Sequence, residues 1–313
     1  MSDLAIEVEG LTKRFGERTA LADLDLAVPR GSAFGFLGPN GAGKTTLIRL
    51  LLGLTEANSG QMRLLGLPVP ELRGAALARV GAIVEEPRFH PFLTGRENLQ
   101  IAAAVRGGAA EARIDGALKR VGLSERADDR VRSYSLGMRQ RLGVGRALLA
   151  DPELLLLDEP TNGLDPAGIH EFRDMIRAFV GEGRTVLLSS HLLDEVERIC
   201  DAVAIVDGGR VVVQGSIEEL KGSGDRTVLI GTPDEVGAQA VLVGHAAVRS
   251  IERNGTGILV TLASDLELTA EEAAGELNRR LTAHGIVVSK LDSQRASLED
   301  RFLQITKRLG GTE

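Results

Sequence analysis

A glycine-rich loop between two apolar segments narrows the range of folds open to this chain. Residues 38–45 have the sequence GPNGAGKT, which fits the pattern G-x-x-x-x-G-K-S/T. Ser32 to Leu37, before the loop, has the length and apolar character of a buried strand. Leu47 to Leu54, after it, has leucines on all sides, as a buried helix does. A strand, a glycine loop and a helix in this order predict an α/β fold with a mainly parallel sheet.

The glycine-rich loop is suited to hold the phosphates of a nucleotide. Glycines allow consecutive backbone N–H groups to converge on phosphate oxygens, and the N-terminus of the following helix favours negative charge. Lys44 would reach the β- and γ-phosphates, and the Thr45 hydroxyl would ligate Mg²⁺. The alternative is a glycine turn that only connects the strand to the helix. The residues expected to contact the nucleotide here are Gly38, Pro39, Asn40, Gly41, Ala42, Gly43, Lys44, Thr45 and Thr46.

Two adjacent acids follow a second apolar strand, Leu154 to Leu157. Side chains of consecutive strand residues point in opposite directions, so Asp158 and Glu159 are suited to different roles. We expect Asp158 to hold Mg²⁺ and Glu159 to polarise the attacking water. An ordinary strand terminus is the alternative. A third buried strand is predicted at Thr185 to Ser190.

Length and composition indicate a globular chain of two domains. With 313 residues, the chain is about twice the ~150 residues of a usual domain. The 44 acidic and 37 basic residues give a net charge of −7, which disfavours a nucleic-acid partner. A single cysteine, Cys200, indicates a reducing compartment. The first residues carry acids where a signal peptide needs basic residues, so we expect none to be cleaved, and no apolar run approaches the ~20 residues of a spanning helix.

The domain boundary is expected near residue 217. Residues 1–217 form the predicted nucleotide-binding domain, with a helical subdomain at about 95–149, and the charged, glycine-containing residues 218–225 form a linker. Residues 226–313 are predicted to form a small α+β domain. Its expected elements are a strand at Arg226 to Ile230, a helix from Asp234, a strand pair around Asn254 to Gly257, a helix at Thr269 to His284, a strand at Ile286 to Leu291 and a helix from Ser297.

Several further segments, taken together, resemble the nucleotide-binding subunit of an ATP-binding cassette (ABC) transporter. Residues 134–141, YSLGMRQR, occupy the place of the family's LSGGQ-type signature, and residues 162–165, NGLD, that of its D-loop. Ser190 and His191 stand at the position of the switch histidine. The resemblance covers roughly residues 4–216 and implies a P-loop NTPase fold, an ABC cassette with a helical subdomain, that binds and hydrolyses ATP with Mg²⁺.

The family resemblance implies roles for five further residues. It implies a dimer in which Ser135 and Gly137 of one subunit close over the γ-phosphate held by the other. His191 would contact the γ-phosphate and the attacking water, and Asp165 would communicate across the interface. Phe15 stands where the family stacks an aromatic ring on adenine, although a phenylalanine here could equally belong to the core.

Two segments depart from the usual family pattern. The family carries a glutamine in the segment between the phosphate loop and the helical subdomain, whereas this chain has Glu85, which we expect to ligate the metal; the alternative is that Glu85 only caps a loop. The signature has leucine and methionine in place of a glycine and the glutamine. These features, with the stretch EEPRFHPFLTGRENL, resemble the bacitracin and lantibiotic self-protection or multidrug export branch.

The resemblance implies an ATPase subunit of a multi-subunit exporter that moves a drug, antibiotic or peptide through separate integral-membrane permease subunits. It would act as a homodimer, or with a closely related second ATPase, on the cytoplasmic face of the cell membrane. Residues 226–313 resemble the small C-terminal domain of drug-export ATPases, a dimer-stabilising or partner-contacting appendage. The alternatives are a soluble, non-transport ABC ATPase of translation, repair or assembly, and an inactive nucleotide sensor, which would need a damaged Lys44, Asp158 or Glu159.

Overall fold

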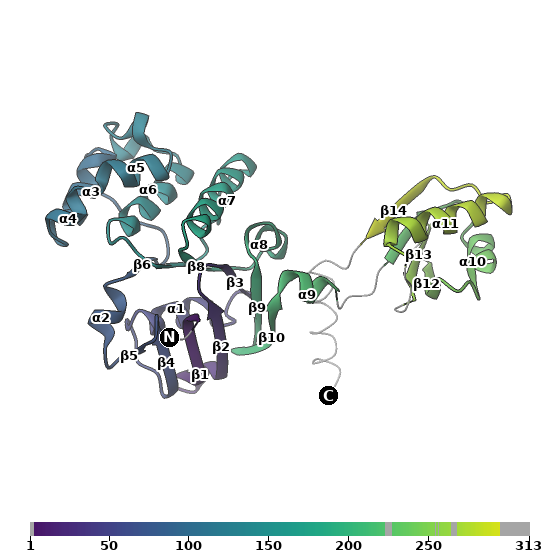
Figure 1. Cartoon of the computed structure of the whole chain (residues 1–313), viewed down its shortest axis with the longest axis horizontal. Coiled ribbons are helices and arrows are strands. Elements are labelled where there is room, and N and C mark those ends of the chain that lie inside the picture. Colours follow the sequence, from purple (N-terminus) through teal and green to yellow (C-terminus); the bar gives the residue numbers. More distant parts are fainter. Residues whose placement is uncertain (1–2, 223–226, 254, 256, 264–267, 295–313) are drawn as a thin grey trace. The chain divides into compact units, whose positions relative to one another are not determined.

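A computed structural model of the chain describes residues 3–222, 227–253, 255, 257–263 and 268–294. The chain forms two compact units, Met1–Ser216 and Ile217–Glu313 (Figure 1). Within the described residues, no helix combines the length and apolar character needed to cross a bilayer.

A six-stranded sheet in the first unit places the predicted site residues. Five neighbouring strands are parallel, and the sixth, β10, pairs antiparallel at one edge. Every residue of β3, β7 and β8 is buried, which explains why β3 and β7 carry no polar side chain and why the centre of β8 is apolar. The mainly parallel sheet is therefore confirmed. In spatial order the strands are β10 (Arg210–Ser216), β9 (Ala202–Asp207), β3 (Ala33–Leu37), β8 (Thr185–Ser190), β7 (Leu154–Leu157) and β6 (Val80–Ile83).

A second, antiparallel sheet in the first unit was not predicted from the sequence. Its strands, in the order β2-β1-β4-β5, are β2 (Arg18–Pro29), β1 (Leu4–Phe15), β4 (Ser59–Leu64) and β5 (Leu67–Val69). The pairing of β1 with β2 shifts register between Val8 and Leu11 and again between Leu11 and Lys13. These irregularities interrupt the alternation of apolar and polar residues by which a half-buried strand is recognised.

Helix α1 (Lys44–Leu51) follows the glycine-rich loop and lies in the core of the first unit. Its residues Leu47, Ile48, Leu50 and Leu51 are fully buried. They belong to one apolar cluster with residues of β3 and of the antiparallel sheet. The helix begins at Lys44, three residues before the predicted start. The phosphate loop is thereby anchored on both sides by core elements.

Helices make up most of the first unit outside its two sheets. Four of them, between β6 and β7, gather in one group (Figure 1). Thr94 starts the group with a capping box: its hydroxyl accepts from the Glu97 amide, and the Glu97 carboxylate accepts from the Thr94 amide. The helices are α2 (Arg73–Leu77), α3 (Gly95–Ala104), α4 (Gly108–Glu111), α5 (Ile114–Arg120), α6 (Leu136–Leu148), α7 (Pro166–Gly181) and α8 (Leu193–Ile199).

The second unit has the βαββαβ order of a ferredoxin-like fold. Its four strands are antiparallel in the order β12-β13-β11-β14, and they share one apolar core with the helices α10 and α11. The elements are α9 (Ile217–Gly222), β11 (Thr227–Gly231), α10 (Glu235–Leu242), β12 (Val248–Arg253), β13 (Gly257–Leu262), α11 (Ala270–Ala283) and β14 (Lys290–Gln294).

Two predictions for the second unit need correction. Residues 217–222, most of which we assigned to a linker, form helix α9, because Ile217 and Leu220 supply a buried apolar face. The last strand is β14, starting at Lys290, whereas we predicted Ile286 to Leu291 from its apolar residues. Ile286 and Val288 instead pack at the edge of the core before the strand begins. The helix predicted from Ser297 lies outside the described residues.

Candidate nucleotide-binding site

At its last glycine, the glycine-rich loop has a backbone conformation that only glycine accommodates. Gly43 stands immediately before α1 with φ of 104°, in the left-handed region. A Cβ atom at this position would lie 2.5 Å from Cδ2 of Leu21 and 2.6 Å from the carbonyl oxygen of Ala20. The loop is therefore pressed against β2 and ends at the N-terminus of α1, a helix end that favours negative charge.

Lys44, the first residue of α1, turns its side chain back across the loop. The residue is only 6% exposed, and its Nζ donates to the carbonyl oxygens of Gly38 at 2.7 Å and of Pro39 at 3.2 Å. The same ammonium lies 3.1 Å from Oε1 of Glu159. The buried charge is thus balanced by one carboxylate and held where the phosphates would lie.

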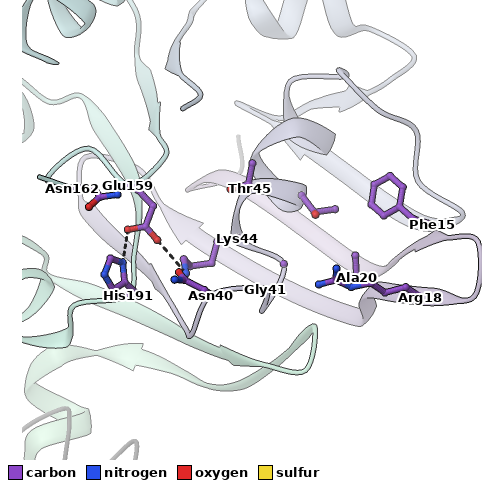
Figure 2. A pocket seen from close by; sticks show the side chains of 12 residues that line it. Phe15, Arg18, Ala20, Asn40, Gly41, Lys44, Thr45, Glu159, Asn162 and His191 are labelled. Carbon is purple, nitrogen blue, oxygen red and sulfur yellow. Dashed lines mark hydrogen bonds and ion pairs between the residues drawn. The ribbon is translucent and has the colours of Figure 1, made fainter. Parts of the chain in front are cut away.

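Glu159 connects the phosphate loop with the residue that follows β8. Its Oε1 pairs with Lys44, and its Oε2 lies 2.8 Å from Nδ1 of His191, as Figure 2 shows. The Glu159 backbone has φ of 46°, an uncommon value for a residue with a side chain. Its amide donates to Oγ of Ser189 at 2.9 Å, which fixes this turn. The structure therefore brings together three predicted residues from separate parts of the chain.

Asp158 takes a different direction from its neighbour Glu159. It is 4% exposed, and its Oδ1 accepts a hydrogen bond of 2.6 Å from the Ser189 hydroxyl. Its amide donates to the carbonyl of Ile83 at 2.9 Å, which ties the acid to β6. The predicted divergence of the two acids is present. Ser189 itself was not predicted; the only sequence signal is a polar residue at the end of the apolar strand β8.

A cleft of about 420 Å³, the first cleft, lies over the phosphate loop. Glu159 and His191 lie near one end of it, and Phe15 and Arg18 at the other (Figure 2). The Phe15 residue is 53% exposed, and Nζ of Lys13 lies 4.7 Å from the ring centroid, so the core alternative for Phe15 is wrong. Sequence reasoning missed Arg18 and Ala20, and it assigned Asn162 to the D-loop segment without a contact to the nucleotide. The cleft is lined by Phe15, Arg18, Ala20, Asn40, Gly41, Gly43, Lys44, Thr45, Thr46, Glu159, Asn162 and His191.

A second cleft, of about 470 Å³, brings the three expected metal ligands together. Thr45, Glu85 and Asp158 line it, and a hydroxyl with two carboxylates is a set of hard oxygen donors that suits Mg²⁺. The described residues contain no cluster of three or more His, Cys, Asp or Glu side chains arranged for a metal ion. Proteins commonly bind Mg²⁺ through one or two carboxylates together with substrate phosphates, and this set contains two carboxylates. The cleft is lined by Thr45, Glu85, Glu86, Leu136, Gln140, Asp158, Glu159, Asn162 and Gly163.

Four residues of the signature and D-loop segments line a cleft, Leu136, Gln140, Asn162 and Gly163, whereas the predicted site residues Ser135, Gly137 and Asp165 line neither. Ser135 caps α6, where its hydroxyl accepts from the Met138 amide at 3.2 Å, and Gly137 lies in the first turn. Asp165 caps α7 by accepting from the Gly168 amide at 2.9 Å. Within one chain these three residues therefore lie at helix starts and have no place in either cleft.

The fold and the first cleft define a P-loop nucleotide-binding protein. A family model described as ABC transporter matches residues 21–162. An uncharacterized ABC transporter ATP-binding protein of Bacillus subtilis, YdbJ, is 40% identical over 98% of this chain and 96% of its own length. The bacitracin transport ATP-binding protein BcrA of Bacillus licheniformis is 39% identical, with 98% of each chain covered. The daunorubicin resistance ATP-binding protein DrrA3 of Streptomyces coeruleorubidus is 39% identical over 98% of this chain and 97% of its own.

Solved structures match about seven-tenths of this chain. The ATP-binding subunit of an ABC transporter is 31% identical with a TM-score of 0.62, covering 69% of this chain and 92% of that one. CbiO1 of Clostridium perfringens, part of the ABC transporter complex cbiONQ, is 28% identical with a TM-score of 0.65, covering 71% and 92%. The chain belongs to the ABC transporter family and is an ATP-binding subunit that hydrolyses ATP. The soluble, non-transport alternative has no support among these relatives.

Proposed function

We propose that this chain supplies the energy for export of an antibiotic, drug or peptide through separate integral-membrane subunits. The bacitracin transport and daunorubicin resistance relatives support this proposal because they align along 98% of the chain. The likeness therefore includes the C-terminal unit as well as the nucleotide-binding unit. In this proposal the chain binds the inner face of the cell membrane through its permease partners, without a nucleic-acid partner.

The proposed hydrolysis depends on Glu159. Its carboxylate, held between Lys44 at 3.1 Å and His191 at 2.8 Å, is the single observation that carries the catalytic assignment. When a nucleotide enters the first cleft, the Lys44 ammonium pairs with the β- and γ-phosphates. Glu159 is then free of one partner and orients a water for in-line attack, while His191 contacts the γ-phosphate.

The expected metal site would serve the same reaction. Thr45 and Asp158 would hold Mg²⁺, and Glu85 at the second cleft would supply a further oxygen. When bound there, the ion neutralises charge on the nucleotide phosphates. Asp158 is already oriented by the Ser189 hydroxyl, so the carboxylate needs little rearrangement to meet the ion.

The site is proposed to be completed by a second copy of this chain or by a closely related ATPase. Ser135 and Gly137 lie at the N-terminus of α6, which favours an anion, yet they line neither cleft of their own chain. A γ-phosphate held by the partner's phosphate loop would meet this helix end. Asp165 at the start of α7 would lie at the same interface.

ATP hydrolysis by a Glu159→Gln variant tests the catalytic assignment. We expect the rate to fall by at least about 10²-fold, the usual contribution of a positioned base, with ATP binding retained. The matched control is Glu125→Gln, which neutralises an exposed acid of the helical group and is expected to leave the rate unchanged. A Glu159→Gln enzyme with normal turnover would remove Glu159 from this role.

Export is tested in cells that carry the chain together with its membrane partner. Deletion of the gene is expected to raise sensitivity to bacitracin-like peptides or anthracyclines, and wild-type protein, but not Glu159→Gln, is expected to restore resistance. If deletion left the sensitivity to both classes of compound unchanged while the ATPase activity was intact, the export role would be contradicted. The assignment as an ATPase would be unaffected.

A further inference from the structure

The loop that follows β6 contacts helix α1 through an ion pair between Glu85 and Arg49. The family resemblance predicts that Glu85, which lines the second cleft, ligates the metal, yet its carboxylate here binds a guanidinium. Both side chains are substantially exposed, 63% for Glu85 and 46% for Arg49. An ion pair this exposed is weak, so the carboxylate can leave it at low cost.

Arg49 lies on the same face of α1 as the expected metal ligand Thr45. The two residues are four positions apart, which places their Cβ atoms about 5–6 Å from each other along one helix face. Glu85 therefore stands beside a helix face that carries a cation at one position and a metal-binding hydroxyl one turn earlier. The carboxylate thus pairs with the cation of this helix face and shares the second cleft with the Thr45 hydroxyl.

The main chain around Glu85 is held in place from the opposite side by α6. A Cβ atom on Gly143 would lie 2.9 Å from Cβ of Pro87, so the loop packs directly on this helix. Arg146 donates to the Arg88 carbonyl at 3.2 Å, and its guanidinium lies 5.1 Å from the ring centroid of Phe89. A change of partner by Glu85 is therefore confined to its side chain.

The backbone of Glu85 is itself constrained. Its φ of 62° lies in the left-handed region, which a glutamate rarely adopts. Such a conformation persists only where the surroundings impose it, and such positions concentrate at ligand-binding sites. The loop geometry thus presents this side chain toward the cleft at some cost in strain.

We infer that Arg49 is a positioning residue that competes with Mg²⁺ for Glu85: the carboxylate pairs with Arg49 before the metal binds and exchanges it for the ion afterwards. The inference rests on the proposed role of Glu85 as a metal ligand. It makes Arg49 a determinant of metal affinity without any contact between Arg49 and the metal. Because the exchange breaks one weak ion pair, Arg49 lowers the metal affinity by a small, measurable factor.

Binding of Mn²⁺ together with a non-hydrolysable ATP analogue, followed by electron paramagnetic resonance on the full chain, tests the exchange. Replacing Arg49 by glutamine is expected to tighten Mn²⁺ binding about two- to fivefold, the range that an exposed ion pair contributes. The matched control is Arg63→Gln on β4, whose guanidinium donates to the Gly66 carbonyl, and it is expected to leave Mn²⁺ binding unchanged.

A double-mutant cycle separates the exchange from a general effect of charge. Glu85→Asn suits the left-handed backbone, shortens the side chain and removes its charge, and it is expected to weaken Mn²⁺ binding. In that background Arg49→Gln should have no further effect. The exchange would be overturned if Arg49→Gln tightened Mn²⁺ binding equally with and without Glu85, or if it did not tighten Mn²⁺ binding at all. Unchanged Mn²⁺ binding in Glu85→Asn would overturn the metal role of Glu85 as well, whereas the Glu159→Gln test is independent of both.

Discussion

At the scale of single residues, the phosphate loop depends on the conformation of Gly43. We expect Gly43→Ala to lose most nucleotide affinity, because the new methyl group would meet the Ala20 carbonyl and the Leu21 side chain in a backbone that disfavours it. A residue forced into such a region costs about 1–3 kcal/mol. Isothermal titration with an ATP analogue and urea unfolding measure the two effects.

The matched control for this glycine is Gly74→Ala. Gly74 lies in α2, and a Cβ atom there would meet no heavy atom within 4 Å. A helical glycine replaced by alanine gains about 0.5–1 kcal/mol of stability, so this variant should bind nucleotide normally. Normal binding by Gly43→Ala would contradict the requirement for a tight glycine loop.

Residue types and their spacing predicted most of the site residues, but they did not predict which side chains contact one another. Lys44, Asp158 and Glu159 follow from motifs whose chemistry depends on residue type and spacing. No sequence motif marks Arg49 as a site residue, because an arginine on a helix usually faces solvent. Its contact with Glu85 arises only when β6 and α1 are packed in one unit, and sequence separation conceals that proximity.

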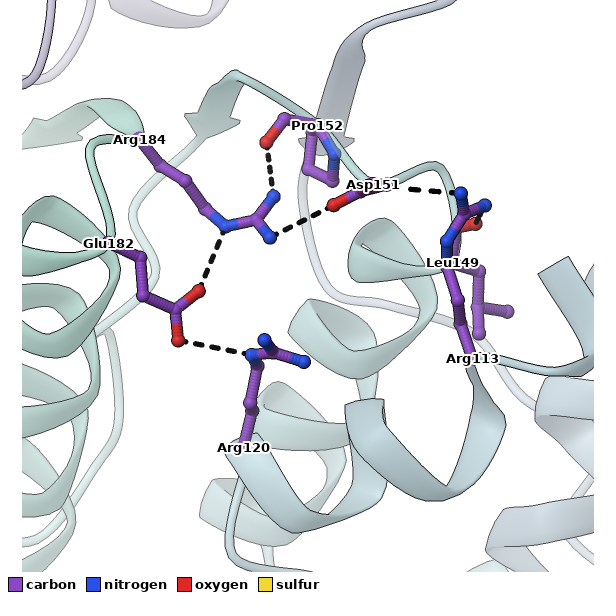
Figure 3. A network of polar contacts seen from close by, with 7 residues as sticks. All are labelled: Arg113, Arg120, Leu149, Asp151, Pro152, Glu182 and Arg184. Carbon is purple, nitrogen blue, oxygen red and sulfur yellow. Dashed lines mark hydrogen bonds and ion pairs between the residues drawn. The ribbon is translucent and has the colours of Figure 1, made fainter. Parts of the chain in front are cut away.

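At the scale of elements, a polar network joins the helical group to the sheet (Figure 3). Arg184, just before β8, donates to Oδ1 of Asp151 at 3.0 Å and to Oε2 of Glu182 at 3.2 Å. Arg120, the last residue of α5, donates to Oε1 of Glu182 at 3.1 Å, and Arg113 lies 3.7 Å from Oδ2 of Asp151. The network therefore connects α5 to the turns before β7 and β8, at the ends opposite the catalytic residues.

The charges of this network make its contribution to stability depend on pH. The hydrogen bond from Arg184 is the main cause that lowers the pKa of Asp151. Burial would raise the pKa of Glu182, but hydrogen bonds from Arg120 and Arg184 outweigh it and lower that pKa. A lowered pKa in the folded state means that the stabilisation is present above the ordinary values of 3.8 and 4.5 and is lost as the pH falls below them.

We predict that Arg184→Met destabilises the first unit by about 1–3 kcal/mol near neutral pH, the contribution of hydrogen bonds to charged groups. The difference from wild type should shrink on acidification to about pH 3, below the ordinary pKa values of 3.8 and 4.5, because the stabilisation is lost as the two carboxylates gain protons. Urea unfolding at the two pH values measures it, with Lys119→Met, an exposed cation of α5, as control. A difference that stays constant with pH would contradict an ionic origin.

The sequence predicted the limits of a strand correctly where the strand is buried on both faces of the sheet. The limits of β7 and β8 match the sequence prediction because each is a continuous apolar run ended by polar residues. β1 was missed because its register shifts break the two-residue period, and β14 was placed too early because apolar residues precede it. In both cases the tertiary pairing determines the strand, and local hydrophobicity does not.

At the scale of the whole molecule, each unit has an apolar core of its own. The cluster around α1 contains residues of the first unit, and the cluster around α11 contains residues of the second, without a shared member among the described residues. Separate cores allow separate unfolding, because cooperativity depends on a common set of packed side chains. We therefore expect the two units to respond independently to core substitutions.

Leu277→Ala tests this independence in the full chain. Leu277 in α11 is fully buried, and its truncation should cost the second unit about 2–5 kcal/mol. Hydrogen exchange should then rise in residues 227–294, while residues 3–216 keep their protection and the affinity for an ATP analogue stays within about twofold. The matched variant Leu47→Ala, which truncates an equally buried leucine of α1, should instead expose the first unit and weaken nucleotide binding. If Leu277→Ala also lowered protection around the phosphate loop, the two cores would be energetically coupled and the second unit would contribute directly to the nucleotide site.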